Sequence, residues 1–330
     1  MKVLTKSDTE IKLDKNDLKI INEIKDNIRQ PLTKIAKKCY LSRQSVEYRI
    51  NQMKKHNIIT GTKTIIDIKK LGYKSFHTFI EIHNKENEEK IIEQALKSDS
   101  VNMIILYNGK YNLEISIITK NESEFLENYT KLVSNKNISN DQTLIITETI
   151  ISKTLTGNKT LQKPQNKENK KYSLDEIDKK ILNLLLNNAT ITNLDIAKEL
   201  NISKDTVKYR INQLENNKII LSYIPAINYS GLGYSLHTLL IKTSADNEKA
   251  KLIESFIKNK DNVLWCGKTF GFYNYEIYII TKNTKQVHEF IEDLKENYSN
   301  EIKTYEILYG HEQLKYAYAS QLPLPNLLGS

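Results

Sequence analysis

Two stretches of the sequence carry side chains that suit contact with the phosphates and bases of a DNA duplex. In residues 41–57 the apolar side chains recur at i, i+4 and i+7, and Arg43, Gln44 and Lys54 lie on the opposite face of the predicted helix. Ser42 is a good N-cap, so this helix begins where free N–H groups and the positive end of the helix dipole can meet an anion. Because Arg and Gln can pair with guanine and adenine, the pattern predicts a DNA-binding helix.

A shorter helix is predicted just before it. Leu32, Ile35 and Ala36 share one face of this segment, and residues 38–41 leave room only for a tight turn before the next helix. Two helices joined in this way form a helix-turn-helix motif, whose second helix enters the major groove.

The same outline occurs twice in the chain. Residues 202–214 match residues 41–53 at an offset of 161 positions, and residues 71–73 match 232–234 at the same offset. Further on the offset drifts by one residue, because residues 111–121 correspond to 273–283. We therefore infer a tandem duplication.

The side chains expected to face DNA lie on the two predicted recognition helices. They are Ser42, Arg43, Gln44, Ser45, Tyr48, Arg49 and Lys54 in the first copy and Ser203, Lys204, Thr206, Lys208, Tyr209 and Arg210 in the second. Arg49 and Arg210 flank the buried stripe of their helices. We therefore expect them to hold the fold or contact phosphate rather than to read bases.

Charge distinguishes the two copies. The formal net charge of the 330-residue chain is +9, which favours acidic partners such as double-stranded DNA. Residues 13–60 hold eleven Lys and Arg against five Asp and Glu, whereas residues 174–221 hold seven of each. The first copy is therefore expected to bind DNA phosphates more strongly than the second.

After residue 73 the hydrophobic period alternates between that of a strand and that of a helix. Strands are predicted at 73–82, 101–107, 111–119 and 143–151, with helices at 88–97 and 122–133, and the second copy repeats this order. The βαββαβ order predicts an α+β, ferredoxin-like domain with two helices on one face of an antiparallel sheet. The other face of the sheet is left open and needs a partner. Just upstream, β-branched runs at 58–68 and 219–228 predict a small wing or a connecting ribbon.

These patterns divide the chain into seven parts. They are a flexible N-terminus (1–12), a helix-turn-helix domain (13–68), a ferredoxin-like domain (69–151), a polar, Lys-rich linker (152–173), a second helix-turn-helix domain (174–229), a second ferredoxin-like domain (230–316) and an unassigned tail (317–330). By random-coil scaling the linker favours pairing of the two ferredoxin-like domains within one chain. We expect a pseudo-dimer, with higher homo-oligomers left open.

Composition argues against several other classes of protein. No run approaches the roughly 18 apolar residues of a membrane span, and the first residues lack the apolar centre of a signal peptide, so we expect a cytoplasmic protein. Cys39 and Cys266 are expected to be small buried side chains. The six histidines show no metal-ligand spacing, so neither a metal nor a cofactor is predicted. His77 and His237, each followed by Thr, are interpreted as corresponding packing or strand-edge residues.

Taken together, these motifs resemble the Lrp/AsnC, or feast/famine, family of bacterial and archaeal transcription regulators. The family pattern around the recognition helix is present as Leu41-Ser42, Val46, Arg49-Ile50 and Met53, and again as Ile202-Ser203, Val207, Arg210-Ile211 and Leu214. The resemblance covers about nine tenths of the chain. It implies two copies of a three-helix winged helix-turn-helix unit, each followed by a ferredoxin-like domain of the RAM type, in a protein that regulates transcription and is not an enzyme.

The resemblance also implies a site for a small-molecule effector. Family members hold an amino acid at a dimer interface with a Gly-x-Tyr/Phe-Asp loop, which corresponds here to Gly109, Tyr111 and Asn112 and to Gly271, Tyr273 and Asn274. Both copies carry Asn in place of the acidic residue, so the carboxylate that would pair with an α-ammonium group is missing. The usual glycine before the wing is also replaced, by Asn57 and by Lys218.

Two alternative functions remain open from the sequence. Siroheme decarboxylases of haem biosynthesis are similar to Lrp/AsnC proteins and work as paired non-identical subunits, which a fused chain could imitate. Their pocket would need convergent Arg and His groups, but neither His77 nor His237 has an Arg close by in the sequence. The other alternative is an amino-acid sensor that does not contact DNA.

Overall fold

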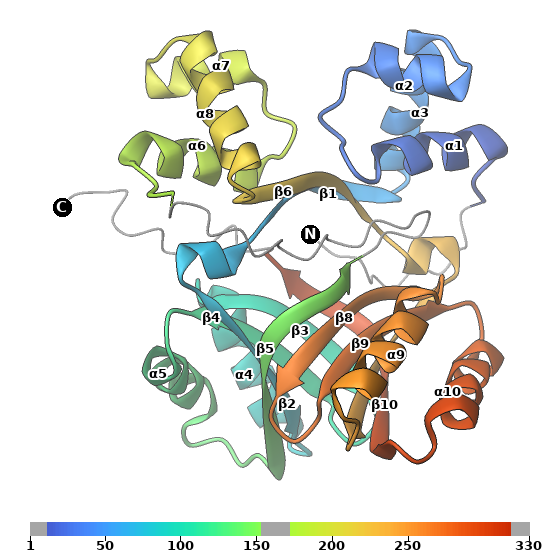
Figure 1. The fold of residues 1–330 in the computed structure, drawn as a ribbon. Helices are drawn as coiled ribbons and strands as arrows, with labels where there is room; N and C mark the ends of the chain where they lie inside the picture. The colour runs from blue at the N-terminus through green and yellow to red at the C-terminus, as the bar shows by residue number, and fades with distance from the viewer. Residues whose placement is uncertain (1–11, 153–171, 318–330) are drawn as a thin grey trace.

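The computed structural model describes residues 12–152 and 172–317, which form two copies of one helix and strand order (Figure 1). The predicted N-terminal segment, linker and tail lie almost entirely outside the described residues. The first copy comprises α1 (Lys15–Ile24), α2 (Leu32–Cys39), α3 (Arg43–Lys55), β1 (Ile59–Ile66), a short 3₁₀ helix (Ile68–Leu71), β2 (Lys74–Glu81), α4 (Lys85–Lys97), β3 (Val101–Asn108), β4 (Leu113–Thr119), α5 (Glu122–Val133) and β5 (Asn140–Ser152).

The second copy repeats this order. It comprises α6 (Glu176–Asn187), α7 (Asn193–Leu200), α8 (Lys204–Asn216), β6 (Ile220–Ile227), a short 3₁₀ helix (Ser230–Leu232), β7 (Ser235–Thr243), α9 (Asn247–Lys258), β8 (Val263–Phe270), β9 (Tyr275–Thr281), α10 (Thr284–Tyr298) and β10 (Ile302–Tyr316). The predicted sequence of three helices followed by βαββαβ is therefore present in both copies.

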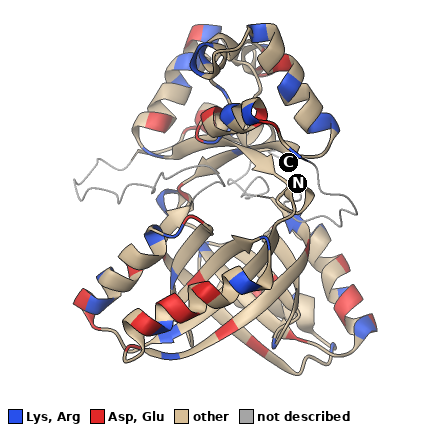
Figure 2. Ribbon diagram, turned by 90° about the vertical axis from the view of Figure 1, so that its right-hand side faces the viewer, with Lys and Arg blue, Asp and Glu red and all other residues tan. Residues whose placement is uncertain are grey.

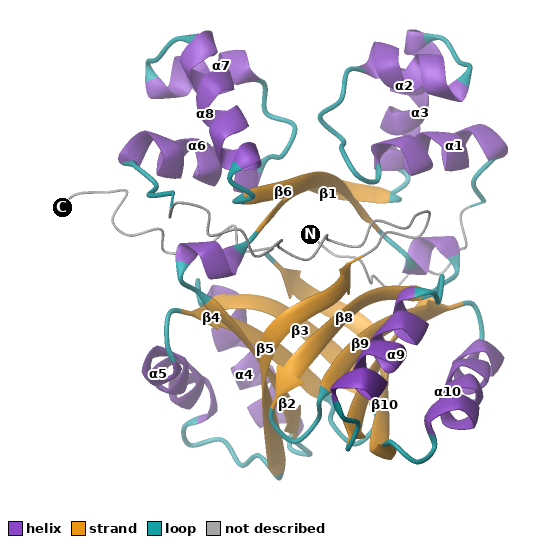
Figure 3. Ribbon diagram, viewed as in Figure 1, coloured by secondary structure: helices purple, strands orange, loops and turns teal. Residues whose placement is uncertain are grey.

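Eight of the strands form one closed antiparallel barrel in the order β10-β3-β4-β2-β5-β8-β9-β7. Each copy contributes four neighbouring strands, which are the predicted ferredoxin-like sheet. The two sheets join edge to edge, because β5 pairs with β8 and β10 pairs with β3. Closure leaves neither sheet with an unpaired edge strand. The faces that the sequence leaves open thus enclose a shared interior, while α4, α5, α9 and α10 cover the outside (Figure 3).

Period-2 alternation decides which side chains enter that interior. In β4, Leu113, Ile115 and Ile117 pack in a cluster with Ile91 and Phe125 of the outer helices. The residues between them, Glu114 and Ser116, are fully buried on the opposite, inner face. The face of the strand that packs against the helices is therefore apolar, and the face that lines the barrel interior is partly polar.

The β-branched runs upstream of the barrel form a ribbon that connects the two copies. β1 pairs with β6 in antiparallel fashion, with Lys63 opposite Ile224. Of the two predicted forms, the connecting ribbon is correct, because each strand has its partner in the other copy. Asn57 and Lys218, just before the two strands, both adopt left-handed backbone, with φ of 55° and 57°. This geometry explains why glycine suits the position in the family pattern.

Because the ribbon crosses the molecule, each helix-turn-helix unit lies over the barrel half of the other copy (Figure 1). The apolar core of α1, α2 and α3 is continuous with Tyr229 and Leu232 of the second copy. Likewise the core of α6, α7 and α8 includes Tyr73 and Ile118 of the first copy. The two copies are thus interlocked rather than stacked.

Candidate nucleic-acid interface and barrel interior

The two recognition helices, α3 and α8, lie in the units at the end of the molecule farthest from the barrel (Figures 1 and 3). Each begins at a serine whose hydroxyl oxygen accepts a hydrogen bond from a backbone N–H in the first turn. The bond from Ser45 to Ser42 is 3.1 Å long, and that from Thr206 to Ser203 is 3.0 Å. The prediction that Ser42 is an N-cap is confirmed. Both serines are thereby engaged in holding the helix start.

Arg49 and Arg210 join each recognition helix to the start of the first helix of its unit. Arg49 Nη1 lies 2.6 Å from Asp14 Oδ2 and 2.8 Å from Asp17 Oδ1. The backbone hydrogen bond from Asp17 and the Arg49 guanidinium hold the pKa of the Asp14 carboxyl below its usual value. Arg210 makes the equivalent ion pairs with Asp175 and Asp178. Of the two predicted roles, the geometry fits the structural one.

The remaining predicted residues of α3 present a mainly basic, hydrogen-bonding surface. Arg43, Gln44 and Lys54 are exposed, and Tyr48 is 64% exposed. Among the described residues, neither Arg43 nor Gln44 makes a side-chain hydrogen bond or ion pair. Ser45 is half-buried. These side chains are therefore available to a ligand outside the fold.

The outer face of α8 differs in charge. Lys204, Lys208 and Tyr209 are exposed as predicted, and Thr206 is half-buried, but the exposed Asp205 stands where α3 has Gln44. Figure 2 shows Lys and Arg recurring along the helices at this end of the molecule. The two recognition surfaces are thus alike in shape and unequal in charge.

The predicted effector loops lie at the two seams of the barrel. Both glycines have positive φ, 148° at Gly109 and 150° at Gly271. A Cβ at Gly109 would lie 3.2 Å from the Ile307 carbonyl oxygen, and one at Gly271 would lie 2.9 Å from that of Thr143. Each loop therefore approaches the backbone of the other copy closely, and the positive φ at both positions favours glycine.

The other loop residues are used by the fold itself. Asn112 Oδ1 accepts a hydrogen bond from the Ile82 N–H at 2.8 Å, and Asn274 Oδ1 accepts one from Thr243 at 2.9 Å. Tyr111 and Tyr273 are both buried. Burial raises the pKa of Tyr273 to about 12. The effector-site prediction for these residues stays a prediction.

A buried polar cluster inside the barrel was not predicted from the sequence. Its centre is His77 of β2, whose Nδ1 lies 2.8 Å from Glu276 Oε1 and 3.2 Å from Glu114 Oε1. Both carboxylates are fully buried. They occupy equivalent places in β4 and β9, so a Glu within two otherwise apolar strand runs is the signal that could have revealed the cluster.

Hydrogen bonds and ring contacts surround this cluster. Tyr278 donates its hydroxyl to Glu114 Oε1 at 2.6 Å, and Tyr107 donates to Oε2 of the same carboxylate. The Trp265 ring stacks on His77 with centroids 5.7 Å apart. Within this cluster, Oε2 of Glu276 is the one buried side-chain oxygen or nitrogen without a hydrogen-bond partner among the described residues.

The titratable groups of the cluster shift one another's pKa. Burial lowers the pKa of His77, but the nearby Glu276 and Glu114 outweigh this and raise the pKa to about 10. Burial also raises the pKa of Glu276. The pKa of each buried tyrosine hydroxyl, Tyr107 and Tyr278, is well above its usual value, so both remain donors.

The predicted correspondence between His77 and His237 is wrong. In the strand pairings His237 lies opposite Ile279, and Phe76 lies opposite Ile117. Ile117 and Ile279 occupy the same place in the matching segments 111–121 and 273–283. His237 therefore corresponds to Phe76. Since side chains alternate along a strand, the two histidines face opposite sides of their sheets. His237 Nε2 lies 2.9 Å from Thr281 Oγ1, away from the buried cluster.

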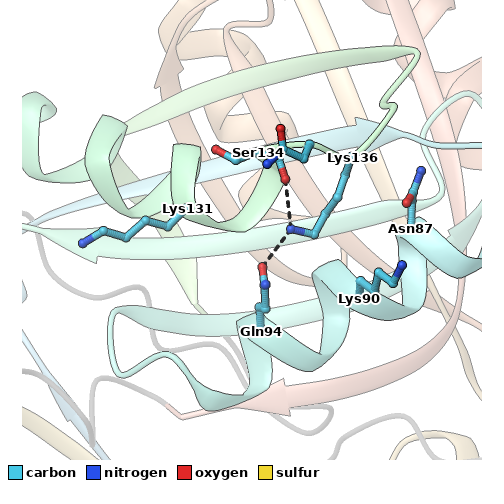
Figure 4. Close-up of a pocket in the computed structure, with 7 residues that line it drawn as sticks. Asn87, Lys90, Gln94, Lys131, Ser134 and Lys136 are labelled. Atoms are coloured by element: carbon cyan, nitrogen blue, oxygen red, sulfur yellow. Dashed lines mark hydrogen bonds between the residues drawn. The ribbon is translucent and has the colours of Figure 1, made fainter.

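One polar hollow lies on the surface between α4 and α5 (Figure 4). Its lysines are paired locally: Lys136 Nζ donates to Gln94 Oε1 at 2.9 Å, while Lys90 and Lys131 pair with Glu86 and Glu127. Nothing there points to a particular ligand.

None of the helices in the described ranges has the length and apolar character needed to cross a bilayer.

Comparison with known proteins agrees with this arrangement. The family model described as winged helix-turn-helix DNA-binding matches residues 13–60 and again residues 174–220. An uncharacterised HTH-type transcriptional regulator of Pyrococcus abyssi is 32% identical over 118 residues, which are 36% of this chain and 80% of that protein. The regulatory protein AsnC of Haemophilus influenzae is 32% identical over 114 residues, 34% of this chain and 75% of that protein.

The two-copy architecture also has a counterpart among solved structures. The siroheme decarboxylase NirDL superposes with a TM-score of 0.62 and covers 91% of this chain and 92% of its own, at 13% identity. At that identity the likeness shows a shared fold alone.

The fold and the recognition helices define a DNA-binding regulator of the winged helix-turn-helix class. The chain belongs to the Lrp/AsnC family of transcription regulators, as a tandem duplicate.

Proposed function

We propose that this regulator binds DNA unequally, with α3 reading bases and α8 contributing mainly shape and phosphate contacts. The main support for this proposal is the difference between the exposed first turns of α3 and α8. Arg43 and Gln44 suit guanine and adenine, whereas Asp205 repels phosphate and accepts hydrogen bonds mainly from cytosine. The net charges of +6 and 0 in residues 13–60 and 174–221 act in the same direction.

The test compares one variant in each helix on the same duplex, selected from a random pool by the protein itself. Arg43→Ala should weaken specific binding by roughly 1 to 3 kcal/mol, and Lys204→Ala by less. Lys85→Ala, an exposed lysine of α4 on the barrel, is the matched control and should change nothing. Titrations at two salt concentrations show whether each loss comes from phosphate contacts, which contribute about 0.9 each to the salt slope. Equal losses for Arg43→Ala and Lys204→Ala would contradict the asymmetry.

We further infer that the barrel is not an enzyme active site of the siroheme decarboxylase kind. All four arginines of the chain, Arg29, Arg43, Arg49 and Arg210, belong to the helix-turn-helix units. His77, the histidine that faces the barrel interior, is flanked by Glu114 and Glu276, which would repel a substrate that carries carboxylates. A tetrapyrrole absorption band that stays with the protein after expression with siroheme would contradict this.

A small-molecule effector, if one binds, is expected at the seam between the copies, beside the loops of Gly109 and Gly271. The support is that each loop touches the other copy, so a ligand there would alter how the halves fit. The side chains of Asn112 and Asn274 are engaged by backbone groups, which disfavours recognition through them. A rise in thermal midpoint with single amino acids would identify the ligand. The proposed site of action is the cytoplasm.

A further inference from the structure

The cluster inside the barrel has the composition and spacing of a metal site. His77, Glu114 and Glu276 are buried, and each offers one ligand atom that lies within 4.8 Å of those of the other two. Two of their separations, 2.8 and 3.2 Å, are close to the roughly 3.3 Å between neighbouring ligands in a tetrahedron with 2.0 Å bonds. We propose that these three side chains bind one divalent first-row metal ion, with Zn²⁺ as the leading candidate.

A second observation, independent of the spacing, is the unpartnered Oε2 of Glu276. This atom belongs to a fully buried carboxylate and has no hydrogen-bond partner among the described residues. A buried oxygen without a partner is costly, and a bound cation satisfies it. Since the two oxygens of one carboxylate can share an ion, Glu276 can bind the metal through either or both.

Burial of the carboxyl groups also favours a cation. Glu114 and Glu276 are fully buried beside one ring nitrogen of His77. A cation bound between them compensates their negative charge in a low-dielectric interior.

The surrounding residues are placed to support such a site. Tyr278 and Tyr107 donate hydrogen bonds to Glu114, and Ser75 Oγ lies 3.1 Å from Nε2 of His77, the nitrogen left free for an outer partner. Outer hydrogen bonds of this kind fix the orientation of metal ligands. One imidazole nitrogen with two carboxylates, and no thiolate, suits Zn²⁺, Mn²⁺, Fe²⁺ or Co²⁺ rather than a soft ion.

The site would exist once per chain and would join the two copies. His77 and Glu114 come from β2 and β4 of the first copy, and Glu276 comes from β9 of the second. The register gives Thr238 as the counterpart of His77 and Ser116 as that of Tyr278, so duplication alone does not produce a second site. A metal here would hold the barrel halves together, and through the crossed ribbon it would affect both DNA-binding units.

The full, tag-free chain reports on this site without any label, because Trp265, its one tryptophan, stacks on His77. After removal of metal with EDTA and dialysis, Zn²⁺ and Co²⁺ are titrated separately. The expected results are one bound ion per chain by elemental analysis, quenching of Trp265 emission by Co²⁺, and visible Co²⁺ absorption bands of low coordination number. The urea midpoint should rise with Zn²⁺.

Three variants and one control locate the ion. Glu276→Gln and His77→Gln should abolish the Co²⁺ bands and the quenching, and Tyr278→Phe should weaken binding by about tenfold as an outer partner. His83→Gln is the control, because His83 is an exposed histidine paired with Glu81 at 3.2 Å and represents surface binding. It should leave all signals unchanged.

Several outcomes would overturn the proposal. These are a wild-type chain that binds no ion at one equivalent, Co²⁺ bands that survive in Glu276→Gln, or bands that disappear in His83→Gln. Circular dichroism checks that each variant is folded. If His77→Gln does not fold, two measurements still test whether the cluster binds a metal ion. They are the number of ions bound by the wild-type chain and the loss of the Co²⁺ bands in the nearly isosteric Glu276→Gln.

Discussion

His237 is a buried histidine in strand β7 of the barrel. Its Nε2 is hydrogen-bonded with Thr281, its ring packs edge-on against Tyr309 at 5.2 Å, and Nδ1 has no partner in the described residues. Burial lowers the pKa of His237 to about 4. The ring is therefore neutral in the folded protein at neutral pH.

This lowered pKa predicts a loss of stability in mild acid. In the unfolded chain a histidine ionises near pH 6.5, so between about pH 6.5 and 4 the unfolded state binds the extra proton and the free energy of unfolding falls. With allowance for solvent screening, His237 should account for about 2 kcal/mol of that fall. His237→Phe, which introduces the residue found at the equivalent Phe76, should remove this contribution.

Urea unfolding at about pH 7 and about pH 5 measures the effect. His83→Phe, a change at an exposed histidine, should keep the full dependence of the wild type. If His237→Phe loses as much stability in acid as the wild type does, the ring is not buried as a neutral group.

At the residue scale the sequence predicts local features well and tertiary ones poorly. The N-cap at Ser42 follows from neighbouring residues alone, and the structural role of Arg49 follows from its place beside the buried stripe of one helix. The His77 cluster could not be derived, because it depends on strand register and on a carboxylate 199 positions away in the sequence. A one-residue difference in register also separates His77 from His237.

At the scale of elements, a single arginine joins the two helix-turn-helix units. Arg29, in the loop between α1 and α2, donates to the carbonyl oxygens of Ala189 and Ile191 at 2.9 and 2.7 Å and to Asn193 Oδ1 at 2.9 Å. Its guanidinium also lies over the Tyr223 ring. These acceptors belong to the loop between α6 and α7 and to the start of α7, so Arg29 helps to set the distance between α3 and α8.

Arg29→Ala should therefore weaken DNA binding without removing a DNA contact. The expected loss on the selected duplex is on the order of tenfold, about 1.4 kcal/mol, because Arg29 no longer helps to hold the spacing of the two recognition helices. The dependence of affinity on salt should stay as in the wild type, since the guanidinium is engaged by protein carbonyls.

Arg29→Lys is the matched control for charge. A lysine cannot reproduce the planar fork that reaches three acceptors, so a positioning role predicts that Lys does not restore affinity. Recovery of wild-type binding by Arg29→Lys, together with a lower salt slope in Arg29→Ala, would show instead that Arg29 contacts phosphate.

The types of the elements could be predicted, but the partner of the ribbon strands could not. Residues 58–68 and 219–228 have the β-branched composition of strands, which is a local property. Whether such a strand folds into a hairpin or pairs with a segment about 160 residues away depends on the crossing of the two copies. The exchange of helix-turn-helix units between barrel halves follows from that pairing and has no local sequence signal.

At the scale of the whole molecule, the two copies share three antiparallel strand pairings. β5 pairs with β8, β10 pairs with β3, and β1 pairs with β6. Ile150 and Ile151 at the end of β5 pack into the core of the second copy. The predicted pseudo-dimer thus has a physical basis in the barrel as well as in the linker.

Cutting the chain between residues 153 and 171 should therefore leave the halves associated. Light scattering should still give the mass of the intact chain, 38.3 kDa, because the three strand pairings and the shared core do not need the covalent link. Cutting does remove an effective concentration on the order of millimolar, so dissociation should become visible on dilution. Ile151→Asp, which places a carboxylate in the core of the second copy, should separate the cut halves while the uncut variant stays one chain. Halves that elute separately without that substitution would show that the linker, rather than the barrel, holds the pseudo-dimer together.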